Sequence, residues 1–358
     1  MNNDIDIVIT YVTDCDNNWC ELYNKYRELE IKEGIQEKSN KQAFGKERTR
    51  DWEFLPYWFR CIEKNCLWCR YVWFVCQQES QVPKWLDRTN PKLKIIYHDQ
   101  FIPKKFLPTF NPMVIKSFLW NIKDLADNFI ESSDDMFFTN KIPNHMFFID
   151  NIPVDDPIKH DYSHKDSDNT AFDKIIKTKD EFLHNIYQKD YKYYFHHLPL
   201  ARNKTFEKTF YTKHQQEIDN ALIISKFRHP KNLISHMYTD AMKFEEKIII
   251  KDIFKNSKCI HLFGDNIEID KINNKDIIVI NDTEFITDFD KLKYTVLNWF
   301  NKKLPNKSSF ELEDTCIDTL NKAKQKIKSK EVKETPSAKP VQKQEKKNKQ
   351  RQTYYLYF

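Results

Sequence analysis

A run of β-branched residues near the start of the chain most constrains its fold. Residues 5–12 read IDIVITYV, and a short, nearly continuous apolar run of this kind is typical of a buried strand in an α/β sheet. Apolar residues at helical spacing follow between residues 51 and 66, and residues 71–76 form a second apolar run. Because parallel strands need a crossover, usually a helix, this order predicts a β-α-β unit.

Further apolar runs and helical patterns extend this order along the chain. Pro112 suits the first turn of a helix that we expect to run to about residue 127. A polar loop is expected at 155–169. The remaining expected elements are strands at 93–97, 129–132 and 277–280 and helices at 172–188, 204–224 and 288–303. We therefore predict an α/β fold, a Rossmann-like sheet flanked by helices, with a mostly helical insertion in the second half.

The positive charge of the chain is concentrated near its C-terminus. The formal net charge is +5, but residues 321–352 hold 12 basic and 3 acidic residues, so the remainder is slightly acidic. A body of this kind lacks the basic surface of a nucleic-acid-binding protein, and we expect no nucleic-acid partner. The composition predicts a domain at residues 1–315 and a basic, disordered tail at 316–358. The tail either contacts an anionic membrane surface or a partner, or only increases solubility.

The expected location follows from two absences in the sequence. No stretch reaches the ~18 consecutive apolar residues of a membrane-spanning helix, and residues 1–4 are not the basic start of a signal peptide. We expect a cytoplasmic protein with eight reduced cysteines. Cys61, Cys66, Cys69 and Cys76 have spacings that zinc ligands can have, but they alternate with aromatic residues, which favours buried thiols.

Two adjacent carboxylates follow the strand expected at 129–132. The chain has only three glycines, which excludes glycine-rich phosphate loops, so phosphate must be held by other groups. Asp134 and Asp135 lie at the carboxyl end of a strand, where ligands of open α/β sheets bind. Mg²⁺ or Mn²⁺ bridging a substrate pyrophosphate would relieve their repulsion. A helix cap or a solvated turn is the simpler alternative. Asn281 and Asp282 follow the last expected strand in the same way.

Histidine and arginine residues supply the remaining groups that phosphoryl transfer needs. His196 or His197 could act as a general base because imidazole titrates near neutral pH, although structural histidines are more common. Arg228 could pair with phosphate, and a surface ion pair is the alternative. Arg48 and Arg50 add two guanidinium groups ahead of a helix. Together these residues favour phosphoryl transfer.

The order of these segments resembles the Stealth family, which includes the capsular polysaccharide phosphotransferases and the catalytic part of N-acetylglucosamine-1-phosphotransferase. The family's opening motif, roughly IDIVYTWVDGSD, resembles residues 5–16 (IDIVITYVTDCD). Its second region, RDWxELRYSLRSIEKxxPWxRxIxxV, resembles the sequence that begins RDWEFLPYWFRCIEK at Arg50. The other matching segments are QVPKWL at 81–86, His98, LPTFN at 107–111, DDMFF at 134–138, HLP at 197–199, FR at 227–228, IND at 280–282 and LPNKSSFE at 304–311.

This resemblance implies an activity and a set of site residues. A hexose 1-phosphate would pass from a nucleotide-diphosphate sugar donor to a hydroxyl of a sugar or polysaccharide acceptor, leaving a phosphodiester and a nucleoside monophosphate. Mg²⁺ or Mn²⁺ would be held on the donor pyrophosphate by Asp134, Asp135 and Asp282. The implied catalytic residues are His197, which takes the acceptor's proton, Arg228, Asp16, Arg50 and Asp51. The implied substrate-binding residues are Arg60, His98, Asn111 and Asn281.

Several positions depart from the family pattern and leave other functions open. Thr13, Phe54, Pro112, Lys116 and Ser133 stand where the family usually has Asp, Glu, Ser, Glu and Asn. The choice of donor and acceptor is therefore open, and reduced activity is possible. The two alternatives are an ordinary glycosyltransferase that forms a glycosidic bond and an inactive carbohydrate-binding homologue.

Overall fold

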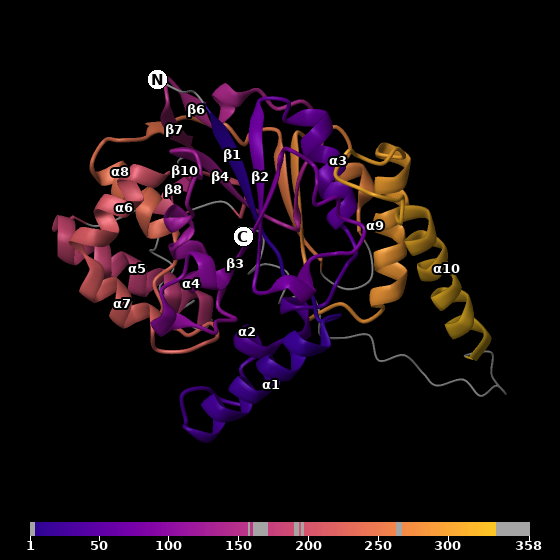
Figure 1. Cartoon of the computed structure of the whole chain (residues 1–358), viewed down its shortest axis with the longest axis horizontal. Coiled ribbons are helices and arrows are strands. Elements are labelled where there is room, and N and C mark those ends of the chain that lie inside the picture. The colour runs from indigo at the N-terminus through magenta and orange to yellow at the C-terminus, as the bar shows by residue number, and fades with distance from the viewer. Residues whose placement is uncertain are drawn as a thin grey trace, which may run out of the picture.

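A five-stranded sheet with the order β10-β4-β1-β2-β3 forms the centre of the molecule (Figure 1). The computed structural model describes residues 4–156, 158–159, 171–189, 193–194, 197–262 and 267–333. The strands are β1 (Ile5–Thr10), β2 (Cys69–Cys76), β3 (Leu93–Tyr97), β4 (Asn128–Ser133) and β10 (Leu200–Asn203). The first four run parallel, and β10 pairs antiparallel with β4. The predicted α/β class is confirmed, and the four expected parallel strands lie within two residues of their predicted bounds.

Helices cover both faces of this sheet, which explains the nearly continuous apolar run in β1. Side chains alternate along a strand, so Ile7 and Ile9 pack into the core on one face and Val8 into the core on the other. In Figure 1, α3, α9 and α10 lie on one side of the sheet, and α5 to α8 lie together on the other. The described helices are α1 (Asn17–Lys32), α2 (Lys41–Phe44), α3 (Leu55–Asn65), α4 (Pro112–Ser117), α5 (Ala171–Tyr187), α6 (Lys204–Lys213), α7 (Gln215–Leu222), α8 (His236–Phe244), α9 (Phe289–Lys303) and α10 (Cys316–Lys333).

Most of the expected helices are present, with two differences. The pattern predicted at 204–224 forms two helices, α6 and α7, that meet at His214. The helix predicted from Pro112 to about residue 127 is wrong in length, because α4 ends at Ser117 and a 3₁₀ turn follows at Leu119–Asn121. Phe118 and Leu119 are both fully buried. Consecutive buried side chains with no polar face between them do not suit the single apolar stripe of a surface helix.

A second, smaller sheet continues from the central one. Its order is β12 (Ser257–His261), β13 (Ile277–Asn281) and β5 (Met136–Phe138), with β12 parallel and β5 antiparallel to β13. The sequence predicted β13 but neither β5 nor β12. Since β4 ends at Ser133 and β5 begins at Met136, Asp134 and Asp135 form the crossing from one sheet to the other. The backbone N–H of Ile280 donates to the carbonyl of Asp135 at 3.0 Å and fixes this crossing.

Short strands lie beside the helical half of the chain. They are β6 (Phe148–Ile149), β7 (Ile152–Asp155), β8 (Ile158–Lys159), β9 (Tyr193–Tyr194) and β11 (Ile249–Ile250). The loop predicted at 155–169 lies largely outside the described residues, as do His196 and residues 334–358. Within the part of the chain that the structure describes, no helix has the combined length and hydrophobicity needed to cross a bilayer.

The prediction of a disordered tail from residue 316 is wrong for its first part. Residues Cys316–Lys333 form α10, which packs against α9. Cys316 and Ala323 are buried and Leu320 packs against the same core, so one narrow apolar stripe orders the helix despite its high lysine content. The domain boundary at residue 315 stays a prediction.

The cysteines in and around α3 and β2 lie in the core. Cys61, Cys66, Cys69 and Cys76 are all buried with free thiols. Burial raises the pKa of Cys61 and of Cys69 to about 12, so both stay protonated at neutral pH. They therefore pack as small apolar side chains.

Candidate active site

The crossing between the two sheets places the carboxylate of Asp135 beside a histidine. His197 immediately precedes the segment that leads into β10, and β10 is the antiparallel neighbour of β4. Its Nε2 lies 3.2 Å from Asp135 Oδ2, although the residues are 62 positions apart. The His197 side chain is 40% exposed, whereas Asp135 Oδ1 is buried and has no hydrogen-bond partner among the described residues. The structure thus brings His197 into contact with one of the paired carboxylates, although the sequence analysis selected the histidine and the pair separately.

Asp134 lies in a crowded group of acids. Burial, followed by the neighbouring negative charges of Asp135 and Asp51, raises the pKa of Asp134 to about 8. Asp51 lies just before α3 and accepts hydrogen bonds from Tyr11 Oη at 3.1 Å and from Thr13 Oγ1 at 3.3 Å. Three neighbouring carboxylates are an arrangement that a hard divalent cation would stabilise.

Arg50 and Asp282 are already engaged with each other. The Arg50 guanidinium binds both oxygens of Asp282, and Trp52 Nε1 donates to Asp282 Oδ2 at 2.9 Å. This bidentate ion pair joins the segment before α3 to the end of β13. The structure therefore does not support Asp282 as a third metal ligand or Arg50 as a free phosphate-binding group. Asn281, the last residue of β13, has a half-buried side chain, and its substrate-binding role stays a prediction.

Arg228 and Arg48 form a cationic group near the carboxylates. No hydrogen bond or ion pair joins the Arg228 side chain to the described residues. Burial and then the nearby positive charge of Arg48 lower the pKa of Arg228 to about 9, so it remains charged at neutral pH. Arg48 donates from Nη2 to Gln42 Oε1 at 2.9 Å, and its Nε forms an ion pair with Glu47 Oε1 at 3.5 Å. The Arg228 guanidinium therefore offers the free donors that suit an anion, and Arg48 lies beside it. The sequence analysis noted Arg48 but left it out of the site.

Asp16 lines a cavity at the carboxyl end of β1. It caps α1, since its Oδ1 accepts from the backbone of Asn18 at 3.1 Å, and its Oδ2 accepts from Ser80 Oγ at 2.7 Å. Asp16 and Asp51 both line a cavity of about 380 Å³ at the carboxyl end of β1. Ligands of α/β sheets bind at this edge, so the cavity belongs to the candidate site.

Comparison with known proteins identifies the family. The family model described as "Stealth protein CR2, conserved region 2" matches residues 48–154. A capsular polysaccharide phosphotransferase WcwK of Streptococcus pneumoniae is 32% identical over 338 residues, which cover 86% of this chain and 98% of the relative. The chain belongs to the Stealth family.

Other relatives extend this comparison. The exopolysaccharide phosphotransferase cps2G of Lactiplantibacillus plantarum is 25% identical over 348 residues, which cover 86% of this Stealth chain and 96% of the relative. Among solved structures, apo mouse xyloside xylosyltransferase 1 matches with a TM-score of 0.35 and 12% identity, over 78% of this chain and 98% of that chain. A match of that size does not establish a common fold.

Three Stealth positions predicted to bind substrate are buried in the protein interior. Asn111 is fully buried and caps α4, accepting from the backbone of Met113 at 3.0 Å and donating to the Phe227 carbonyl at 2.7 Å. His98 is also buried, and burial lowers the pKa of its imidazole to about 3. The burial of both side chains does not support the predicted substrate contacts of Asn111 and His98.

Arg60 is the third such position, and it stabilises the fold. Its Nε and Nη2 donate to the two oxygens of Glu311 at 2.9 and 2.7 Å, and Nη2 also donates to Asp314 at 2.8 Å. Its Nη1 donates to the Leu304 carbonyl at 2.9 Å. Arg60 therefore joins α3 to the segment between α9 and α10, and these contacts do not support its predicted role in substrate binding.

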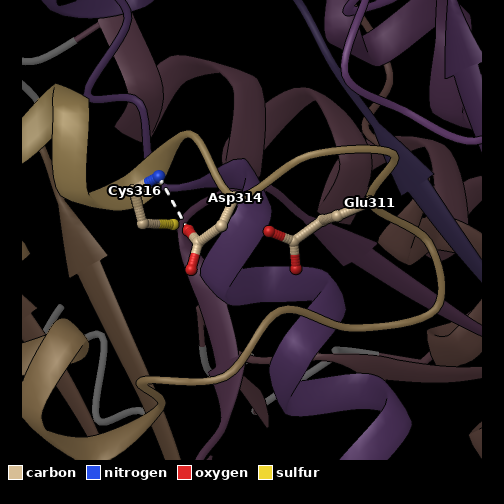
Figure 2. A group of neighbouring side chains, drawn as sticks. All are labelled: Glu311, Asp314 and Cys316. Atoms are coloured by element: carbon tan, nitrogen blue, oxygen red, sulfur yellow. Dashed lines mark hydrogen bonds between the residues drawn. The ribbon is translucent and has the colours of Figure 1, made fainter.

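The same segment holds a group of side chains that resembles a metal site. Figure 2 shows Glu311, Asp314 and Cys316 together, with the Cys316 backbone N–H donating to Asp314 Oδ1 at 3.0 Å. One potential ligand atom of each lies within 4.8 Å of the others. The Arg60 guanidinium already neutralises both carboxylates, and burial raises the pKa of the Cys316 thiol to about 12. We therefore assign this group to folding and not to metal binding.

The departures from the Stealth pattern are accommodated within the structure. Lys116 donates to Ser133 Oγ at 3.0 Å and pairs with Glu131 at 2.9 Å, so two departures contact each other. Burial alone would raise the pKa of Glu131, but Lys116 and Arg202 outweigh it and lower that pKa to about 2. Phe54 packs against aromatic rings of the core, and Pro112 begins α4. None of these residues leaves an uncompensated charge in the described core.

Proposed function

We propose that this Stealth protein transfers a hexose 1-phosphate from a nucleotide-diphosphate sugar to a hydroxyl of a sugar or polysaccharide acceptor. The contact between His197 and Asp135, beside Asp134 and Arg228, is the observation that carries this proposal. It joins a base, two carboxylates and a cationic group at one sheet edge, as phosphoryl transfer requires. The phosphotransferase names of the relatives support transfer of a sugar phosphate in polysaccharide synthesis.

Mg²⁺ or Mn²⁺ fits the two adjacent carboxylates. Asp135 Oδ1 is buried without a hydrogen-bond partner in the described residues, and Asp134 lies beside two other acids. Asp134 and Asp135 would hold the ion, and Asp282 would not because Arg50 binds both of its oxygens. When bound, the ion would neutralise charge on the donor pyrophosphate.

His197 is positioned to accept the proton of the acceptor hydroxyl. If its Nε2–H donates to Asp135 Oδ2, Nδ1 is left as the proton acceptor, and Asp135 fixes the orientation of the ring. The exposure of the ring lets an acceptor sugar reach it. The hydroxyl oxygen then forms a bond to the sugar-linked phosphorus, and the bond from that phosphorus to the bridging oxygen of the pyrophosphate breaks. The products are a phosphodiester and a nucleoside monophosphate.

Arg228 and Arg48 would bind the phosphoryl oxygens during this step. Arg228 has no competing partner in the described part of the protein, and its guanidinium can bind two oxygens at once. Its charge would be most useful in the transition state, where negative charge is spread over the equatorial oxygens.

Product analysis tests this function. Purified protein is incubated with Mg²⁺, a panel of nucleotide sugars and an acceptor oligosaccharide, and nucleoside monophosphate release is measured beside phosphorus NMR of the product. We expect a phosphodiester signal, lost in His197→Ala and kept in His145→Ala, a matched change at an exposed histidine. Sugar transfer without a phosphodiester would indicate a glycosyltransferase. Nucleotide-sugar binding without turnover in the wild type would indicate an inactive homologue.

The location of the protein in the cell and the role of its basic tail are separate from this activity. The cytoplasmic location and a membrane or partner contact of the basic tail stay predictions, since most of that tail lies outside the described residues.

A further inference from the structure

The cavity beside Asp16 is built from segments far apart in the sequence. Thr13 and Asp16 follow β1, Gln81 follows β2, Asp51 precedes α3, and Thr319 and Lys322 belong to α10. Its volume of about 380 Å³ is within the range of small-molecule sites. The helix α10, expected to be disordered, therefore forms one wall of a cavity that includes two candidate site residues.

An unpartnered polar atom at the cavity wall points to a ligand. Gln81 is only 2% exposed. Its Nε2 donates to the Thr13 carbonyl at 3.4 Å, but its Oε1 has no hydrogen-bond partner within the described residues. A buried amide oxygen without a donor is costly, and a ligand N–H or O–H in the cavity would satisfy it.

The charges around the cavity favour an uncharged, hydroxyl-bearing group. Asp16, Asp51 and Glu53 line it, against Lys84 and Lys322. Three carboxylates would repel a phosphate, whereas carboxylates and hydroxyls are good partners for the hydroxyls of a ribose or another sugar. The Arg228 guanidinium, with Arg48 beside it, lies instead near Asp135.

The position of Asp51 relates the cavity to the donor. Asp51 lines the cavity and also acts electrostatically on Asp134, whereas His197 contacts Asp135. In an in-line displacement the leaving group departs opposite the attacking hydroxyl. The nucleoside monophosphate should therefore lie on the Asp51 side of the carboxylate pair, and the acceptor on the His197 side.

We propose that the cavity binds the nucleoside part of the donor, that Gln81 Oε1 accepts a hydrogen bond from it, and that α10 limits its size. This inference rests on the proposed function and assigns specificity to α10, which lies outside the segments that match the family motifs. Thr319 and Lys322 are then specificity-determining residues on a helix whose sequence resembles a disordered tail.

Two variants and a matched control test this assignment. Thr319→Trp places a large side chain into the cavity, and Gln81→Met removes the amide while keeping the length of the side chain. Ile317→Trp introduces the same side chain on the same helix at a residue that is 55% exposed and does not line the cavity. The melting temperature of each of the three variants is measured as the control for folding.

Binding is measured by calorimetry in the presence of Mg²⁺. The four nucleoside probes are UDP, CDP, GDP and ADP, and inorganic pyrophosphate is the control ligand that lacks a nucleoside. We expect Thr319→Trp to weaken binding of the preferred nucleoside diphosphate by roughly tenfold or more because the inserted ring excludes the ligand. Gln81→Met should weaken it several-fold, as expected for one lost hydrogen bond. Pyrophosphate binding should be unchanged in both, and Ile317→Trp should match the wild type.

Three outcomes would overturn the inference. Wild-type affinity of Thr319→Trp for the nucleoside diphosphate, or an equal loss of pyrophosphate binding, would show that the nucleoside lies elsewhere. In that case nucleoside monophosphate release by the wild type would leave the proposed function intact. A wild-type protein that binds none of the four nucleoside diphosphates would overturn both.

Discussion

The buried ion pair between Arg60 and Glu311 gives a direct test of whether a motif arginine stabilises the fold or binds substrate. We predict that Arg60→Met destabilises the protein and leaves the KM for donor and acceptor unchanged. Both side chains are almost fully buried, at 2% and 0% exposure. Methionine is long enough to occupy much of the same space, but it leaves the Glu311 carboxylate buried without its counter-charge.

The contacts of Glu311 set the expected magnitude. Removing one partner of a buried ion pair costs about 3–5 kcal/mol. Ser308 still donates to Glu311 Oε1 from its backbone N–H at 2.7 Å and from Oγ at 2.9 Å, whereas Oε2 loses the donor Arg60 Nη2. Because one oxygen keeps its hydrogen bonds, we expect a loss near the lower limit, about 3 kcal/mol. For a chain of this size that corresponds to a fall in Tm of roughly 4 °C.

The measurement compares Arg60→Met with Arg88→Met, in which the same substitution removes an exposed ion pair. The side chains of Arg88 and Glu79 are 47% and 59% exposed, so loss of this ion pair should lower the free energy of unfolding by less than about 1 kcal/mol. Tm is measured by differential scanning fluorimetry and the free energy of unfolding by urea denaturation. An Arg60→Met protein with wild-type stability and a raised donor KM would refute the reasoning and return Arg60 to the substrate site.

Four further changes test the site and the core. Asp135→Ala should abolish turnover even at saturating Mg²⁺, measured as nucleoside monophosphate release across a Mg²⁺ titration; full activity would contradict its role as a ligand. His197→Ala should lower kcat by about 10²–10⁴-fold with Tm within about 1 °C of the wild type, because the side chain is half-exposed and makes one long contact. Arg228→Lys should lower kcat strongly because the point charge of lysine does not reproduce the two-pronged guanidinium group. Tm should not fall, since no ion pair within the described residues is lost. A wild-type kcat in this variant would count against phosphate binding by Arg228. The pKa of Glu131 is about 2 in the folded protein and about 4.3 in the unfolded chain. Lys116 and Arg202 therefore stabilise the fold through Glu131 above about pH 4.3, and this stabilisation is lost as pH falls toward 2. In urea denaturation from pH 5 to 3, the free energy of unfolding should fall less in Glu131→Gln than in the wild type.

The sequence was most informative where local pattern and position in the sheet agree. The strands β1 to β4 follow from short apolar runs, and the site position of Asp134 and Asp135 follows from the end of β4. The proximity of His197 could not be derived from spacing, because it depends on β10 pairing antiparallel with β4. The family resemblance selected His197, and the structure supplied its contact with Asp135.

Other positions could not be assigned because a motif does not distinguish a buried polar residue from one that binds a ligand. Arg60 and Asn111 match the Stealth pattern, yet both are buried and satisfied by protein groups. The helix α10 was missed because its lysine-rich composition outweighs a narrow stripe of apolar residues. Cys316, Leu320 and Ala323 recur at helical spacing, and this spacing was the signal that could have predicted it.

The crossing of Asp134 and Asp135 between two sheets has a consequence for how this protein can evolve. The carboxylates are held by β4 on one side and by β5 and β13 on the other, with the Ile280 N–H bonded to the Asp135 carbonyl. A change in the packing of the second sheet, for example at the fully buried Val279, would shift one carboxylate relative to the other. If the proposed Mg²⁺ or Mn²⁺ binds this pair, laboratory selection for a different divalent ion should recover mutations in β5 and β13 as well as at the carboxylates.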